Sequence, residues 1–279
     1  MSDDATNDVG QPESSRAAEG RRVRGLRWRL GWLAPQGWTA FVGEIVVVIA
    51  GVLIALGAGE LLAAWNWQRK VAQGEQQLAA ELQRSYRPAM EQAVVEPCIQ
   101  AQLAILSKRL MASGNTLEPA PVVESRIGDT VVVFPNRTYV DATWVALLDD
   151  GTLPHMASER RGRYASAYRQ FARLEAMNPD GTRSRGRLLS LGWPLPLDAP
   201  TRADLLGELG EQSVRSRFQS LLAIQGMRIV DDLGHTPDRA SIDAFLEASA
   251  TVKHCRDAGL PLTDVESVMR DSGNRTPNP

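Results

Sequence analysis

An apolar run from residue 41 to residue 65 constrains this chain more than any other feature. Its ionisable side chains are Glu44 and Glu60, and Ile45 to Gly59 is wholly apolar. Read as an α-helix, the run is about 37 Å long, which exceeds the roughly 30 Å hydrocarbon layer of a bilayer. Because apolar residues occur all round such a helix, we expect a membrane-spanning helix and not the core helix of a soluble protein.

The flanks of the run predict its orientation. No acidic residue occurs from Gly20 to Gly43, whereas the basic residues beyond the run are diluted by Glu75 and Glu81. The arginine-rich side of a span stays in the cytoplasm, so we expect residues 1–40 to be a disordered cytosolic arm and the remainder to be exported. A cleavable signal peptide is the alternative, but the leader is long and no clean small-x-small site follows. The arm carries Arg21, Arg22, Arg24, Arg27 and Arg29.

Two further features concern the bilayer. Trp38, Trp65 and Trp67 flank the run, where indole rings favour the headgroup zone, so we interpret them as interface anchors. Small residues recur every four positions along the run, at Gly43, Gly51, Ala55 and Gly59 among others. Such a face lets two helices pack closely and predicts a homodimer. The alternative is that small residues are simply common in membrane helices.

The run and its exit resemble a known family. The stretch from Gly43 to Leu56, read as GEIVVVIAGVLIAL, and the exit WNWQRK at 65–70 resemble an uncharacterised family of bacterial single-pass membrane proteins. A looser likeness covers Thr143-Trp144 and the later Gly151-Thr152-Leu153; the chain departs from the family at 57–60, where GAGE replaces an Asn-rich stretch. The resemblance implies a bacterial membrane protein, and it brings no activity. Together with the predicted orientation, it leads us to expect an inner-membrane protein whose C-terminal domain is periplasmic.

The exported part is predicted to be mainly α, a helical-bundle-like soluble domain. Apolar residues at helical spacing over 66–112 predict a stalk and a second helix, separated near Pro88 and Pro97 because proline interrupts helices. Within the domain at 113–270 we expect a loop at 113–128 and a short extended or strand segment at 131–134. A helix hairpin over 141–174 and a flexible loop at 178–187 should follow. A long helix, opened by a Thr201-x-x-Asp204 capping box and ended by Gly234 and Pro237, and a last helix at 238–258 complete the domain. Residues 271–279 are predicted to be a disordered tail.

Cys98 and Cys255 are the cysteines of the chain. In an exported domain they are predicted to form a disulfide, with two buried free thiols as the alternative. The three histidines show no metal-ligand spacing, and nucleophile, dinucleotide and phosphate-loop motifs are absent, so we expect no metal, no cofactor and no enzyme. A net charge of -2 argues against nucleic acid as a partner.

A row of arginines on the helix after residue 158 has two interpretations. The row could bind an anion or a lipid headgroup, or it could be a solvated helix face; we favour the solvated face. The row comprises Arg160, Arg161, Arg163, Arg169 and Arg173.

The predicted function is structural: a bitopic protein that presents its helical domain to an unknown envelope protein or to a second copy. The alternative is a small-molecule sensor that signals through the span, and an envelope hydrolase comes third. A cavity lined by convergent polar groups would favour the sensor, whereas a solid core would favour interaction.

Overall fold

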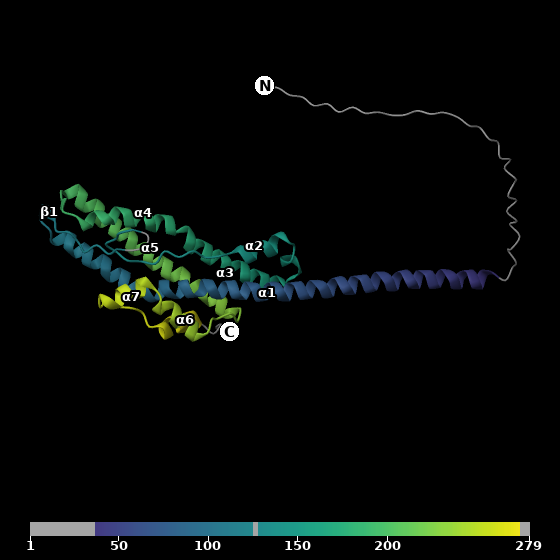
Figure 1. The fold of residues 1–279 in the computed structure, drawn as a ribbon. Helices are drawn as coiled ribbons and strands as arrows, with labels where there is room; N and C mark the ends of the chain where they lie inside the picture. The colour runs from purple at the N-terminus through teal and green to yellow at the C-terminus, as the bar shows by residue number, and fades with distance from the viewer. Residues whose placement is uncertain (1–36, 125–127, 274–279) are drawn as a thin grey trace, which may run out of the picture. The chain divides into compact units, whose positions relative to one another are not determined.

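The computed structural model describes residues 37–124 and 128–273. The described chain is mainly helical, as predicted (Figure 1). It divides into two units between Gly59 and Glu60, and we call residues 60–273 the helical domain. The predicted cytosolic arm at residues 1–36, with its five arginines, and the last part of the predicted tail, residues 274–279, lie outside the described residues.

Helix α1 (Gly37–Ala112) is continuous, and both Pro88 and Pro97 lie inside it. The predicted break between a stalk and a second helix is therefore wrong. A proline inside a helix costs about 3 kcal/mol in isolation, but every residue from Pro88 to Val95 is buried, so packing on all sides holds this part of the helix together. The Val94 carbonyl, in the turn before Pro97, accepts a hydrogen bond from the Thr263 amide at 2.9 Å.

A very small sheet follows α1. Strand β1 (Thr116–Leu117), inside the loop predicted at 113–128, pairs antiparallel with β2 (Leu195–Pro196). The segment at 131–134, predicted to be extended or a strand, forms no strand of the described chain, and Val131 and Val132 lie in a bend. We call residues 130–135 the extended segment, after its predicted form. Its backbone is bound instead by the Gln102 side chain, which donates to the Val133 carbonyl at 3.1 Å and accepts from the Val133 amide at 2.8 Å.

The predicted helix hairpin is confirmed. It consists of α2 (Ala142–Asp149), the 3-10 helix η1 (Leu153–His155) and α3 (Ser158–Ala176). Gly151 ends the first arm with φ of +74°, a backbone conformation that favours glycine. Asp150 accepts hydrogen bonds from the Thr152 amide and hydroxyl, and these bonds lower the pKa of Asp150.

The flexible loop predicted at 178–187 is wrong, because α4 (Asn178–Leu188) occupies it. Its sequence is polar, and tertiary contacts stabilise it: Asn178 donates to the Arg137 carbonyl at 2.7 Å, and Gly181 packs near the Phe134 ring. The 3-10 helix η2 (Leu189–Gly192) follows. Helix α5 (Ala199–Asp232) begins before the predicted capping box, because Asp198 is its N-cap and accepts from the Thr201 amide at 2.8 Å. Gly234, with φ of +75°, lies just beyond its end.

The last predicted helix is in fact two. Helix α6 (Arg239–Glu247) ends before Ser249, and Ser249 caps α7 (Ala250–Asp257) by accepting from the Val252 amide at 3.1 Å. Helix α8 (Val265–Gly273) was not predicted, and it includes residues 271–273 of the predicted disordered tail.

The domain part of α1 is the central element of the helical domain. Figure 1 shows α2 to α5 along one flank of it and α6 with α7 on the other. Side-chain contacts agree, because Glu81 binds α2 and α3, Gln100 binds Ser213 of α5, and Arg87 binds Ser241 of α6. A single hydrophobic core surrounds this helix.

Candidate functional site

The apolar segment of α1 is uncovered in the single chain. It is the one helix in the described ranges that is long and apolar enough to cross a membrane, with a window of mean hydropathy 2.6 and none of that window buried. A Cβ added at Gly43, Gly51 or Gly59 would meet no atom within 4 Å, and Ala55 is exposed. The small-residue face is therefore open, and its pairing with a second copy stays a prediction.

The three tryptophans predicted as interface anchors differ in their surroundings. Trp38 is 83% exposed and Trp65 is 52% exposed. Trp67 is partly buried and stacks on the His155 ring, with centroids 3.8 Å apart. Lys70 lies over the same indole at 5.0 Å and pairs with Asp150 at 3.1 Å. The exit motif thus contacts the loop after α2, and the membrane-interface role of all three rings stays a prediction.

Glu81 is a buried carboxylate that joins α1 to the hairpin. It accepts from the Thr143 amide at 3.0 Å, from the Thr143 hydroxyl at 2.8 Å and from the Tyr168 hydroxyl at 2.8 Å. Trp144 stacks on Tyr168. The exit motif at 65–70 and the pair Thr143-Trp144 therefore both lie where α1 meets the hairpin.

Cys98 of α1 and Cys255 of α7 form a disulfide, as predicted. Both are fully buried, and their Cα atoms are 6.0 Å apart. The bond fastens α7 to α1 across 157 positions of sequence.

Glu91 forms a second link between α1 and its neighbours. Its carboxylate binds the Arg137 guanidinium at 2.6 and 2.9 Å and also accepts from the Ser249 hydroxyl. Arg137 follows the extended segment, and Ser249 is the N-cap of α7. One buried carboxylate thus holds two separate parts of the domain on α1.

These two parts are walls of a cavity of about 490 Å³. Phe134 and Pro135 line it from the extended segment, Arg185 from α4, and Thr251 and His254 from α7. The cavity has both polar and apolar walls, and the links through Glu91, through the disulfide and through Gln102 all tie its walls to α1.

Arg185 is the unusual side chain of this cavity. It is only 8% exposed, its guanidinium carbon lies 4.5 Å from the centre of the Phe134 ring, and it donates to the Phe134 carbonyl at 3.1 Å. Its Nε has no hydrogen-bond partner, and no ion pair of Arg185 occurs among the described residues. Burial lowers the pKa of Arg185. Sequence reasoning missed this residue because it stands in a polar segment that gives no sign of burial.

The histidines lie in three different places. His155 stacks on Trp67, His235 is 2.7 Å from the Tyr164 hydroxyl, and His254 lines the cavity. Burial lowers the pKa of His235 and of His254. Over residues 37–124 and 128–273, no group of three His, Cys, Asp or Glu could hold a metal ion.

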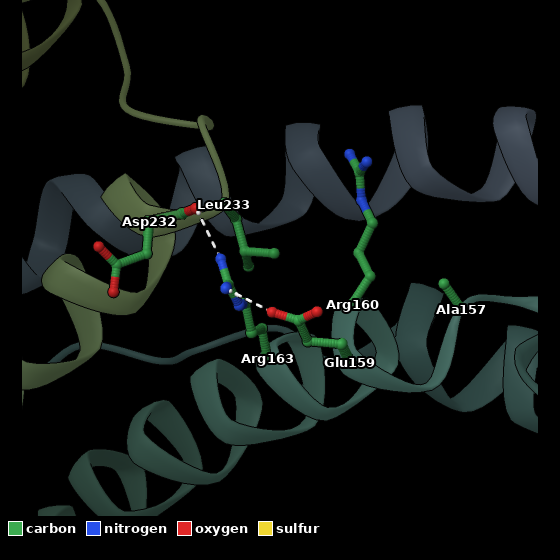
Figure 2. A pocket seen from close by; sticks show the side chains of 6 residues that line it. All are labelled: Ala157, Glu159, Arg160, Arg163, Asp232 and Leu233. Carbon is green, nitrogen blue, oxygen red and sulfur yellow. Dashed lines mark hydrogen bonds and ion pairs between the residues drawn. The ribbon is translucent and has the colours of Figure 1, made fainter.

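The arginine row of α3 forms contacts within the domain. Figure 2 shows Arg163 between the Glu159 carboxylate, at 2.7 Å, and the Asp232 carbonyl, at 3.4 Å. Arg160 pairs with Glu75 of α1 at 2.9 Å. The pocket beside them is about 270 Å³ and its cations are already paired, which favours a solvated face over an anion site.

Helix α5 exposes several large apolar side chains. Phe218 and Leu221 are exposed, as is Val214 one turn before Phe218. The three lie at helical spacing on one face. Nothing in the structure shows what covers it.

Comparison with known proteins gives no relative. No model of a protein family matches the chain, and neither a curated protein nor a solved structure matches it. The family resemblance of the membrane segment therefore stays an expectation, and the function has to be argued from the site itself.

Proposed function

We propose that the chain is a bitopic protein of the bacterial inner membrane, with a cytoplasmic N-terminus and a helical domain in the periplasm that binds a small molecule. The open apolar segment of α1 supports the anchor. The disulfide between Cys98 and Cys255 supports an oxidising compartment, because such bonds are rare in the cytosol. The arginine-rich arm supports the orientation.

The cavity at Arg185 is the observation that carries the ligand-binding function. Sites for small molecules are concave, mostly apolar and bear a few converging polar groups, and their volumes are about 300 to 1,000 Å³. The cavity of about 490 Å³ fits this description, since Phe134 and Pro135 supply apolar surface while Arg185, Thr251 and His254 supply polar groups. Of the two functions expected from the sequence, it favours the sensor.

The fastening of the cavity walls supports a signalling role. A ligand that changes the separation between the extended segment and α7 would act on Glu91 and on the disulfide, and both belong to α1. A bound ligand can shift a conformation only by as much as its affinities for the two states differ. We propose that the signal passes to an envelope protein.

A role as an interaction domain is a second proposal. The open face at Gly43, Gly51, Ala55 and Gly59 supports it, because a second copy would cover this face.

Topology and binding are tested separately. A reporter that works only in the periplasm, fused at the C-terminus, should be active, and carbonate washing should leave the chain in its vesicles; a cytosolic reporter signal would contradict the anchor.

For binding, full-length protein in nanodiscs is incubated with a periplasmic extract, and retained small molecules are identified by mass spectrometry. Ala250→Trp, which places an indole at the wall of the cavity, should abolish retention, whereas Ala244→Trp on the exposed face of α6 should not.

A further inference from the structure

We propose that the cavity binds a small organic anion whose carboxylate or phosphate group is held by Arg185. This inference rests on the proposed ligand-binding function and names the chemical class of its ligand. The observation behind it is a buried cation that has no ion pair within the part of the chain that the structure describes and whose Nε has no hydrogen-bond partner there.

Among residues 37–124 and 128–273, no carboxylate forms an ion pair with Arg185. Removing a guanidinium from water is costly unless the charge is paired, and buried arginines in folded proteins usually have a carboxylate beside them. The Arg185 guanidinium instead lies over the Phe134 ring and donates to the Phe134 carbonyl. Arg137, the other arginine of the cavity, differs because Glu91 neutralises it. Glu124, the carboxylate among the lining residues, is exposed to solvent and forms no recorded ion pair with Arg185.

The donors of Arg185 are largely free. A guanidinium carries five N–H groups, and Arg185 uses one of them in the hydrogen bond to the Phe134 carbonyl. The Phe134 ring lies against the guanidinium, and the N–H groups that are not bonded to the Phe134 carbonyl can donate to an anionic group.

Helix α7 adds favourable electrostatics to the same cavity. Its first-turn residues Ala250 and Thr251 line the space, and the N-terminal end of a helix favours negative charge. His254, one turn further along, also lines it. No acidic residue of α7 itself lies in its first turn, and the Glu91 carboxylate accepts from the N-cap Ser249.

The remaining walls indicate the rest of the ligand. Val133, Phe134, Pro135 and Ala248 are apolar and line the cavity. Inorganic phosphate or chloride would leave this surface in contact with water. An organic acid places its charged group at Arg185 and its apolar part against these residues, which buries both kinds of surface.

Benzoate, phenyl phosphate and the neutral isostere benzamide are the probes, titrated by calorimetry into full-length protein in nanodiscs. Benzoate or phenyl phosphate should bind, and comparing the two decides between carboxylate and phosphate. Benzamide should bind at least about 30-fold more weakly, since losing one partner of a buried charge pair costs that much or more. Equal binding of benzamide, or no binding of either anion, would overturn the inference.

Arg185→Met should weaken binding of the anion by about 30-fold or more and leave the melting temperature of the unliganded protein unchanged or higher, because an unpaired buried charge is removed. Arg183→Met, which removes an exposed arginine of the same helix paired with Asp180, should leave binding unchanged. If the Arg185→Met variant binds anions normally, or if its melting temperature falls strongly, then Arg185 stabilises the fold and does not bind the anion, and the inference is wrong. Should Ala250→Trp abolish binding of a neutral ligand that Arg185→Met still binds, the ligand-binding function stands and this inference is wrong.

Discussion

Glu91 of α1 binds Arg137 through two parallel hydrogen bonds, Nε to Oε2 at 2.6 Å and Nη2 to Oε1 at 2.9 Å. The carboxylate is completely buried, whereas the Arg137 side chain keeps 37% of its surface exposed. The same carboxylate accepts from Ser249, the N-cap of α7. The bond therefore positions the extended segment and α7 together, and the shape of the cavity between them depends on it.

Replacing this carboxylate should loosen both cavity walls. Glu91→Gln keeps the size of the side chain but cannot accept both bonds from the guanidinium, so we expect the free energy of unfolding to fall by about 2 to 3 kcal/mol, as for hydrogen bonds to charged groups. Urea titration of the full chain, followed by circular dichroism, measures the change. Glu211→Gln, an exposed position on α5, is the matched control and should leave stability unchanged. Equal stability of Glu91→Gln and the wild type would show that this link contributes nothing to the free energy of unfolding.

The disulfide should contribute substantially to stability. The chain-entropy treatment gives about 5 kcal/mol for a closed loop of this length, as an upper value. The double variant Cys98→Ala with Cys255→Ala should lower the melting temperature, and reducing the wild type should lower it to a similar value. Maleimide applied after denaturation without reductant should label neither cysteine of protein from the membrane. Labelling of both would contradict the bond.

The sequence predicted well those elements whose own residues determine them. The hairpin at α2 and α3, the end of α5 at Gly234 and the cysteine pair all follow from local spacing, turn residues or residue type. The continuity of α1 through Pro88 and Pro97 could not be predicted, because it depends on burial from Pro88 to Val95 by neighbours distant in sequence. Helix α4 was missed for the same reason: its residues are polar, and its stability comes from contacts with Phe134 and Arg137.

The residues around the cavity could be predicted from the sequence only in part. Cys98 and Cys255 could be paired from residue type and topology. Arg185 could not be found, because an arginine in a run of Arg, Ser and Gly is normally solvated. Only the folded chain shows that its guanidinium lies against Phe134 without a carboxylate.

Stability should fall as the pH is lowered through the range in which histidine titrates. Burial lowers the pKa of His235 and of His254 below the ordinary value of 6.5. Below about that pH the unfolded chain binds protons more readily than the folded chain, so the stability present at neutral pH is progressively lost. Melting temperatures measured from pH 8 to pH 5.5 should show a shallower dependence in His235→Gln with His254→Gln than in the wild type. Parallel curves would show that these side chains do not cause the loss.

One substitution should have opposite effects at two glycines of α5. At Gly226 an added Cβ would lie 2.9 Å from Cε1 of Phe171, a buried ring stacked on Tyr139, so Gly226→Ala should lower stability by about 1 to 3 kcal/mol through overpacking. At Gly207 no atom lies within 4 Å, so Gly207→Ala should raise stability by about 1 kcal/mol through helix propensity. Thermal unfolding of both variants tests the packing of α3 on α5, and a stabilising Gly226→Ala would contradict it.

Self-association through the membrane segment should depend on its small residues. The backbone at Gly51 and Gly59 is open to a neighbour, since an added Cβ meets nothing within 4 Å. Two helices that pack through such a face gain close backbone contact, and a bulky residue separates them. Gly51→Ile with Gly59→Ile should therefore abolish the signal in a membrane two-hybrid assay, whereas Leu53→Ile with Leu61→Ile, off this face, should preserve it. Unchanged association of the glycine variant would show that the small residues do not form the contact.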